Sequence, residues 1–132
     1  MNSAIIEAKF RRYNVESERL FLRKSAPDNV KDVLNSIPSV IEKDLIVIFY
    51  RSSNCFWAMT LEKIIIFSEG SWLTVLFQDI DKIDTDFLDQ PKQNISEIGL
   101  LMKNSSTARL AVEETTWHVV LGILKLLKVQ HQ

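Results

Sequence analysis

Short runs of apolar and polar residues between positions 45 and 77 predict a series of β-strands. Leu45–Tyr50 is rich in β-branched and aromatic residues and ends at a polar turn, which is typical of a strand. Cys55–Thr60 is expected to be its antiparallel partner, and Glu62–Ser68 follows almost at once. Glu69-Gly70-Ser71 has the residues that a hairpin turn needs before Trp72–Phe77. This part of the chain is therefore expected to form a four-stranded meander.

A second group of strands is expected beyond residue 78. Ile80 and Ile83 are predicted to point inward from a segment that is otherwise polar and acidic, and Asp86–Gln93 is expected to be a loop. Glu97–Lys103 and Thr107–Val112 both alternate apolar and polar residues, so they are expected to pair as a hairpin.

Helical periodicity is strongest near the N-terminus. Ser3 can cap a first helix in which Ile6, Phe10 and Tyr13 share one face. A second helical piece is expected through Glu16–Lys24.

A further helix is expected after a break in the pattern. Asp28 is its expected N-cap, and Pro38 ends or bends it. Residues 1–43 are therefore predicted to be a helical extension packed on a core formed by residues 44–132, within one structural unit.

The C-terminal helix is predicted to be apolar over most of its circumference. Thr115 or Thr116 can cap it, and it is expected to run from Trp117 to Val129. Its apolar positions cover roughly 220° of the helical projection, more than the stripe of about 100° that a helix packed on one side needs. One cover is expected to be the sheet. The other is either the N-terminal helices or a second copy of the chain, which leaves a homodimer through this helix open.

Two segments resemble the bacterial pleckstrin-homology-like (PH-like) family. The first, WAMTLEKIIIFSEG, resembles that family's strand-turn-strand pattern at Met59, Thr60, Lys63, Ile64 and Ile65. The second, VLFQDIDKI, resembles the following strand, which ends in a polar residue and an isoleucine, here Asp79 and Ile80. Lys63 stands where arginine is commoner in the family, and the Asn often seen after the Thr is missing.

The resemblance covers about residues 40–128 and has implications for fold and function. It implies an α+β fold, a PH-like antiparallel β-barrel or sandwich of about six to seven strands closed by a C-terminal helix and preceded by N-terminal helices. It also implies a bacterial, non-enzymatic scaffold of a kind that hosts lipid, peptide and protein ligands alike.

Composition restricts the function classes. The 132 residues carry a net charge of −1, which supplies no overall positive field for nucleic acid or for an anionic membrane. The single cysteine, Cys55, excludes an internal disulfide and fits a reducing compartment. The N-terminus places charges among its apolar residues, unlike a secretory signal. A cytoplasmic location is therefore expected.

Acidic residues are concentrated between positions 79 and 89, where only Lys82 opposes Asp79, Asp81, Asp84, Asp86 and Asp89. Their mutual repulsion costs stability unless the segment is well solvated or a cation compensates it. A plain exposed loop and a binding site for basic side chains of a protein partner are the two main interpretations. A calcium loop is a third, but the segment lacks the glycine and the terminal glutamate of an EF-hand, so no metal or cofactor is assigned.

The three tryptophans are interpreted differently. Trp57 and Trp117 are assigned to the core. Trp72 directly follows the predicted Glu-Gly-Ser turn, so it is expected either to pack or to contact a partner.

No catalytic constellation is found in the sequence, and an enzyme is not expected. Cys55 lies in an apolar strand and His118 in the first turn of the closing helix, and nothing indicates that they meet. A Gly-rich phosphate loop and a nucleophile elbow are also missing. Phosphoinositide binding is disfavoured because Arg51 stands alone in the first hairpin turn.

Two functions from different classes follow. The favoured one is a protein-binding module, in its most specific form a bacterial immunity-type protein that occludes the surface of a partner toxin through the five aspartates and Trp72. The alternative is a peripheral lipid-binding or membrane-binding PH-like module that uses the basic N-terminal residues Arg11, Arg12, Arg19, Arg23 and Lys24.

Overall fold

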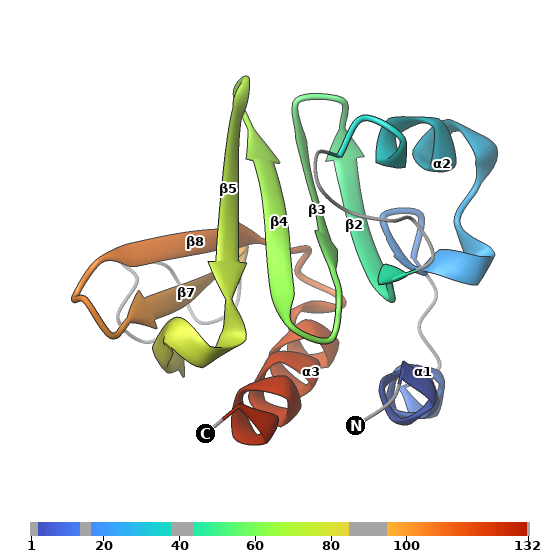
Figure 1. Ribbon diagram of the computed structural model, residues 1–132. Coiled ribbons are helices and arrows are strands. Elements are labelled where there is room, and N and C mark those ends of the chain that lie inside the picture. The colour runs from blue at the N-terminus through green and yellow to red at the C-terminus, as the bar shows by residue number, and fades with distance from the viewer. Residues whose placement is uncertain (1–2, 14–16, 38–43, 85–94, 132) are drawn as a thin grey trace.

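The computed structural model describes residues 3–13, 17–37, 44–84 and 95–131, which form an α+β fold of two antiparallel sheets and three α-helices (Figure 1). Sheet A has the strand order β1-β2-β3-β4-β5, and sheet B has the order β6-β7-β8. The helices are α1 (Ser3–Arg12), α2 (Asp28–Leu34) and α3 (Trp117–Gln130). The strands are β1 (Leu20–Leu22), β2 (Val47–Ser52), β3 (Cys55–Met59), β4 (Lys63–Ser68), β5 (Ser71–Leu76), β6 (Ile80–Asp84), β7 (Glu97–Met102) and β8 (Thr107–Ala111). Short 3-10 turns, η1 (Arg23–Ser25) and η3 (Phe77–Asp79), follow β1 and β5.

The predicted meander and the predicted second group of strands are both confirmed. Strands β2 to β5 pair consecutively, and so do β6 to β8. The β4–β5 turn has two residues with positive φ, Glu69 (49°) and Gly70 (81°), which is the geometry of a tight hairpin whose twist matches its strands. Ile80 and Ile83 are buried, as expected. Within the described ranges, no helix combines the length and the apolar character that crossing a bilayer demands.

The N-terminal segment contributes a strand as well as helices. Leu20–Leu22 forms β1 and pairs antiparallel with β2, so the prediction of a helix through Glu16–Lys24 is wrong. Leu20 and Leu22 are buried while Phe21 is half-buried, an alternation that suits a strand. The segment 1–43 is therefore not purely a helical extension, because it supplies one edge of sheet A.

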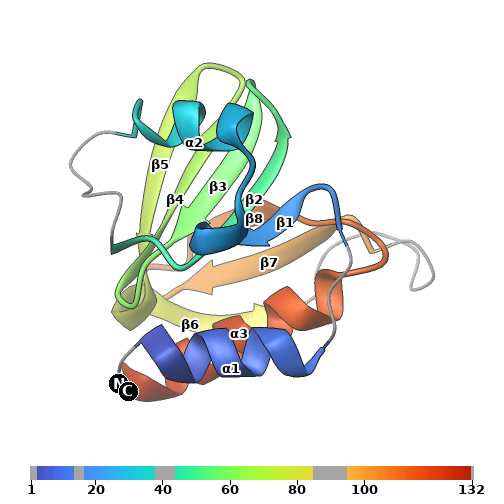
Figure 2. The same ribbon diagram turned by 90° about the vertical axis from the view of Figure 1, so that its right-hand side faces the viewer.

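Helix α2 covers the face of sheet A that points away from sheet B and α3, here called the outer face. It begins at Asp28 with Pro27 at the N-cap position, so the prediction of Asp28 as N-cap is wrong by one residue. Val30 and Leu34 are buried against this face, and Figure 2 shows α2 on sheet A, away from α1 and α3. Pro38 lies outside the described residues.

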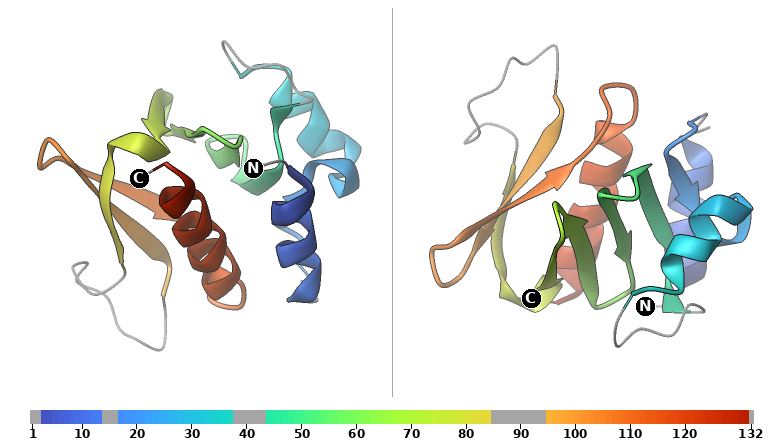
Figure 3. Two further views of the ribbon diagram at one scale, coloured as in Figure 1. Left: turned by 60° about the horizontal axis from the view of Figure 1, so that its bottom comes forward. Right: turned by 90° about the horizontal axis from the view of Figure 1, so that it is seen from above.

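Helix α3 is covered from two directions, as its wide apolar surface predicts. Its buried residues share one core cluster with both sheets and are Val119, Val120, Ile123, Leu124 and Leu127. Helix α1 lies along α3 and adds Ile6 and Phe10 to the same cluster (Figure 3). The two helices meet at Gly122, where an added Cβ would come within 2.8 Å of the Tyr13 hydroxyl. Helix α1 thus supplies the second cover, and a homodimer through α3 stays a prediction.

The Trp57 side chain connects sheet A with sheet B. Its side chain is 1% exposed, and its indole N–H donates a hydrogen bond to the Ala111 carbonyl at the end of β8, at 2.7 Å. Its ring also stacks on Phe49 of β2. Trp57 is therefore a residue of sheet A whose buried side chain is hydrogen-bonded to sheet B.

Thr60 organises the turn between β3 and β4. Its hydroxyl accepts hydrogen bonds from the backbone N–H groups of Glu62 (3.1 Å) and Lys63 (3.2 Å), and its own N–H donates to the Lys63 carbonyl. The side chain is 7% exposed, so water does not readily replace it. This bonding gives Thr60 a physical role in fixing the β3–β4 turn.

Replacing Thr60 by Val, which has the same shape but no hydroxyl, is expected to lower the free energy of unfolding by about 1–2 kcal/mol, because two turn N–H groups lose their acceptor. Urea unfolding followed by circular dichroism measures this. Thr60→Ser keeps the hydroxyl and is expected to lose distinctly less stability. Equal losses in the Val and Ser variants would contradict the role assigned to the hydroxyl.

Trp57→Phe is expected to lower the free energy of unfolding by about 2–4 kcal/mol, because it removes the bond between the sheets and leaves a void in the core. Trp72→Phe makes the same chemical change at a partly exposed site and is expected to cost about 0.5 kcal/mol or less. Chemical unfolding of both variants gives the comparison. Similar losses would show that the Trp57 indole does not hold the sheets together.

Candidate protein-binding surface

Four aromatic residues form a row across sheet A, one from each of the strands β2 to β5. The strand register places Tyr50 opposite Phe56. Phe56 in turn lies opposite Phe67, and Phe67 lies opposite Trp72. Neighbouring ring centroids are 6.2, 5.3 and 4.7 Å apart along the row. Directly opposed aromatic pairs are a source of sheet stability, so this aromatic row ties the outer face of sheet A together.

The aromatic row ends at β5, which is an edge strand. Within the described residues β5 pairs with β4 alone. Trp72 is 39% exposed and Leu73 is 48% exposed, and their side chains point to opposite faces of the sheet. The sequence of β5, SWLTVL, has no charged residue and no proline. Natural edge strands are usually protected by such residues or by a bulge, so β5 is an unusually open apolar edge.

A cleft of about 610 Å³ lies beside this edge, between β5 and the β7–β8 hairpin. Leu73 and Val75 of β5 line one side of it. Met102 and Ala108 of the hairpin line the other side. These four residues give the cleft an apolar portion that suits an apolar side chain of a ligand, and uncharged polar residues, Thr74, Asn104, Ser106 and Thr107, line much of the rest.

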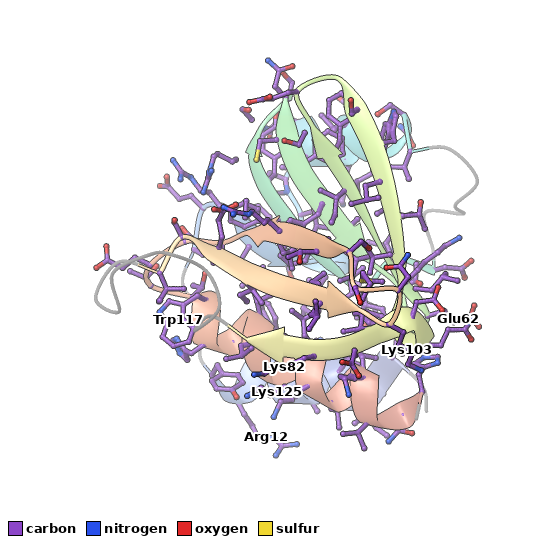
Figure 4. The ribbon with its side chains drawn as sticks, turned by 90° about the vertical axis from the view of Figure 1, so that its left-hand side faces the viewer. Arg12, Glu62, Lys82, Lys103, Trp117 and Lys125 are labelled. Carbon is purple, nitrogen blue, oxygen red and sulfur yellow. The ribbon has the colours of Figure 1, made fainter. Side chains whose placement is uncertain are left out.

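Two charged residues lie at the η3 end of the cleft. Asp79 and Lys103 both line it, and the backbone N–H of Lys103 donates to the Asp79 carbonyl at 2.9 Å. Figure 4, which faces sheet B, shows Lys103 and Glu62 projecting at the same end of the molecule. The cleft therefore combines an apolar length with charges at one end.

The predicted acidic cluster is divided between two elements. Asp79 lies in η3 and lines the cleft, whereas Asp81 is exposed in β6 where the pairing with β7 is irregular. Asp84 is the last residue of β6. Asp86 and Asp89 lie outside the described residues. Among the described aspartates of this group, Asp79 is thus the one that lines the cleft next to the open edge.

The tryptophans differ in the way that the sequence suggests, with one exception. Trp57 is buried, as predicted. Trp117 is only partly buried, because it packs on the border of the core and contacts His118. Trp72 packs against Phe67 and is also partly exposed, so its contact with a partner stays a prediction.

A second groove, of about 530 Å³, includes Cys55, Arg51 and Arg109 in its lining. The Arg51 guanidinium donates a hydrogen bond to the Val112 carbonyl at 3.3 Å. Arg109 forms an ion pair with Glu97, also at 3.3 Å. Both guanidinium groups are thus engaged within the chain, which makes this groove a poor site for an anionic headgroup.

The partial exposure of Trp72 predicts a small effect on folding. Trp72→Ala is expected to lower the free energy of unfolding by about 1 kcal/mol, mainly through its aromatic contacts. Phe56→Ala, at the buried centre of the aromatic row, is expected to cost about 3–5 kcal/mol. Denaturant unfolding monitored by circular dichroism compares them. A Trp72→Ala loss as large as that of Phe56→Ala would assign Trp72 to the core.

Neither metal chemistry nor a relative identifies this surface further. Within the described part of the chain, no three or more His, Cys, Asp or Glu side chains are grouped so that they could hold a metal ion. No protein-family model matches this sequence, and no curated protein is significantly similar to it. The candidate surface is consequently defined by the open edge of β5, the aromatic row and the adjoining cleft.

Proposed function

We propose that the chain is a non-enzymatic, protein-binding module with a PH-like barrel, and that it acts in bacteria as an immunity-type protein that covers the surface of a partner toxin. The order of its elements supports the PH-like part of this proposal. A four-stranded meander (β2 to β5), a three-stranded sheet (β6 to β8) and a closing helix (α3) follow one another as that layout requires. The additional strand β1 and the helices α1 and α2 come from the N-terminal segment.

The observation that carries the proposal is the open apolar edge of β5 beside the cleft. Exposed apolar edges of this kind promote unwanted association. The presence of one in a folded protein therefore indicates a site that a partner covers. Trp72 and Leu73 are exposed there although most other large apolar side chains of sheet A are buried. The surface thus has the composition of an interface core, with an aromatic anchor and an aliphatic neighbour.

Occlusion requires a surface with a polar border, and Asp79 supplies part of that border where it lines the cleft beside β5. Asp81 is exposed in β6 of sheet B, beyond η3. Carboxylates at the rim of an interface attract a basic partner and raise the rate of association. We therefore assign Trp72 and Leu73 to anchoring and the two aspartates to attraction of a basic toxin surface.

The alternative function is peripheral binding to anionic lipid through the N-terminal basic residues. Arg11 and Arg12 are exposed in the last turn of α1, which favours it. Lys24, in contrast, lies 3.6 Å from Glu7 and is partly neutralised. Flotation with liposomes that contain anionic lipid separates the two functions. Recovery of the protein with these vesicles, but not with neutral ones, would favour the lipid function.

Charge reversal at the rim tests the protein-binding function. The chain is co-expressed in a bacterial host with a candidate toxin identified by copurification with it, and growth rescue and the Kd of the purified pair are measured. Asp79→Lys combined with Asp81→Lys is expected to weaken binding about tenfold or more and to reduce rescue, because like charges then oppose each other.

Asp32→Lys is the matched control, since Asp32 is exposed on α2, away from β5. It makes the same substitution at one position, which is half of the charge change of the double variant, and is expected to leave the Kd within about twofold of that of the natural chain. Full rescue and unchanged affinity in the double variant would refute the assigned surface. Failure of the natural chain to bind or neutralise the toxin would refute the immunity function itself.

A further inference from the structure

The direction of the backbone groups of β5 can be derived from the hairpin. Its two-residue turn makes Ser68 and Ser71 the hydrogen-bonded closing pair, and such pairs alternate along an antiparallel ladder. Further along, the Phe77 N–H donates to the Glu62 carbonyl. Phe77 is an even number of residues from Ser71, so it belongs to the same hydrogen-bonded set. Odd-numbered residues of β5 therefore bond to β4. Trp72 and Thr74 direct their N–H and C=O groups away from β4, toward the open side.

We propose that β5 binds an extended segment of a partner protein as an added, antiparallel sixth strand of sheet A. This proposal rests on the proposed protein-binding function and specifies how the partner is held. The outward N–H and C=O groups of Trp72 and Thr74 form the hydrogen bonds, as in other cases of strand addition. With six residues, β5 offers about 20 Å of edge, enough for a strand of ordinary length.

The side chains around the edge define the partner strand. The aromatic row Tyr50–Phe56–Phe67–Trp72 continues onto the added strand, so an aromatic or β-branched residue fits opposite Trp72. On the other face, Leu73 and Val75 line the cleft, so the alternate residues of the partner that point into it are aliphatic. The recognised segment thus carries an aromatic or β-branched residue opposite Trp72 and aliphatic residues toward the cleft.

Charge distinguishes a partner protein from a second copy of this chain. Glu69 precedes β5 and Asp79 follows it. Antiparallel pairing of two β5 strands about a two-fold axis would bring Glu69 of each copy near Asp79 of the other, and opposed like charges are unfavourable. Lys103 lines the cleft with Asp79 and offsets part of that charge, but Glu69 lies at the other end of β5. A strand with Lys or Arg at its ends matches both positions.

A synthetic peptide provides the probe, and hydrogen exchange of the full-length chain provides the measurement. The peptide KTVTVFTK, blocked at both ends, places Phe opposite Trp72, valines toward the cleft and Lys at both ends when it runs antiparallel to β5. At about 1 mM peptide, a Kd near 100 μM slows the exchange of the Trp72 and Thr74 amides about tenfold. The Leu73 and Val75 amides, already bonded to β4, are expected to change little.

Two controls isolate the backbone hydrogen bonds. Thr74→Pro removes an outward N–H, which an edge strand tolerates, and is expected to abolish the protection of the Trp72 amide, whereas Thr74→Val retains it. The same peptide with N-methyl groups on its Phe and on the Thr two residues earlier changes nothing in the protein and is expected to give no protection. Protection that survives N-methylation would overturn the proposal.

Other outcomes also decide the matter. No slowing of the Trp72 and Thr74 amides at 1 mM peptide would overturn strand addition, as would a dimer of the chain alone in which these amides are already protected. Peptide binding without neutralisation of the toxin would refute the immunity function and retain strand addition. Neutralisation that persists undiminished in Thr74→Pro would refute strand addition and retain the immunity function.

Discussion

The hydrogen bond from the Trp57 indole to the Ala111 carbonyl is the constraint on which the arrangement of the two sheets depends. Sheets A and B are connected in the chain only through η3 among the described residues, so a second attachment is needed to fix their angle. Trp57 supplies it from β3, and Arg51 adds a hydrogen bond to Val112 from the neighbouring strand. Both bonds end at consecutive carbonyls, where β8 leaves sheet B.

Attachment at two corners explains where the cleft is. At one corner Trp57 and Arg51 hold the end of β8 against β2 and β3. At the other, the Lys103 N–H bonds to the Asp79 carbonyl, so the β7–β8 hairpin is held at η3. Between these attachments β5 has no described strand beside it on its outer side, and the cleft lies there. The candidate surface is therefore a consequence of how the sheets are joined.

The N-terminal segment closes the remaining side. Ser17 donates a hydrogen bond to the Glu113 carboxylate, which also accepts one from the buried Thr116 at the start of α3. These hydrogen bonds connect the residues just before β1 with those just before α3. With α1 packed along α3 next to Gly122, the N-terminal segment is thus attached at two places, to the closing helix and to the residues just before it. The segment is thus integral to the fold.

Strand pairing could be predicted from the sequence because local turn chemistry determines it. Glu69-Gly70 demands positive φ at two positions, and that alone sets Phe67 opposite Trp72. Leu20–Leu22 was unpredictable because three apolar residues fit a strand and a helical stripe equally well, and β2 decides between them. The aspartates are close in sequence, but the change from η3 to β6 separates Asp79 from Asp81. The exposure of Leu73 depends on how the sheets are joined, which no local pattern encodes.

The aromatic row and the open edge are two results of one arrangement. Each directly opposed aromatic pair stabilises the sheet, and Trp72, at the end of the row, has a paired strand on one side only among the described residues. A charged residue at position 72 would protect this edge from unwanted association, a feature that edge strands commonly have. Here the row ends in Trp72, with Leu73 exposed on the other face, and the hydrogen-bonding groups of β5 face outward between them. An added strand that continues the row, as we propose, would cover Trp72 and Leu73 and would form hydrogen bonds with these outward groups.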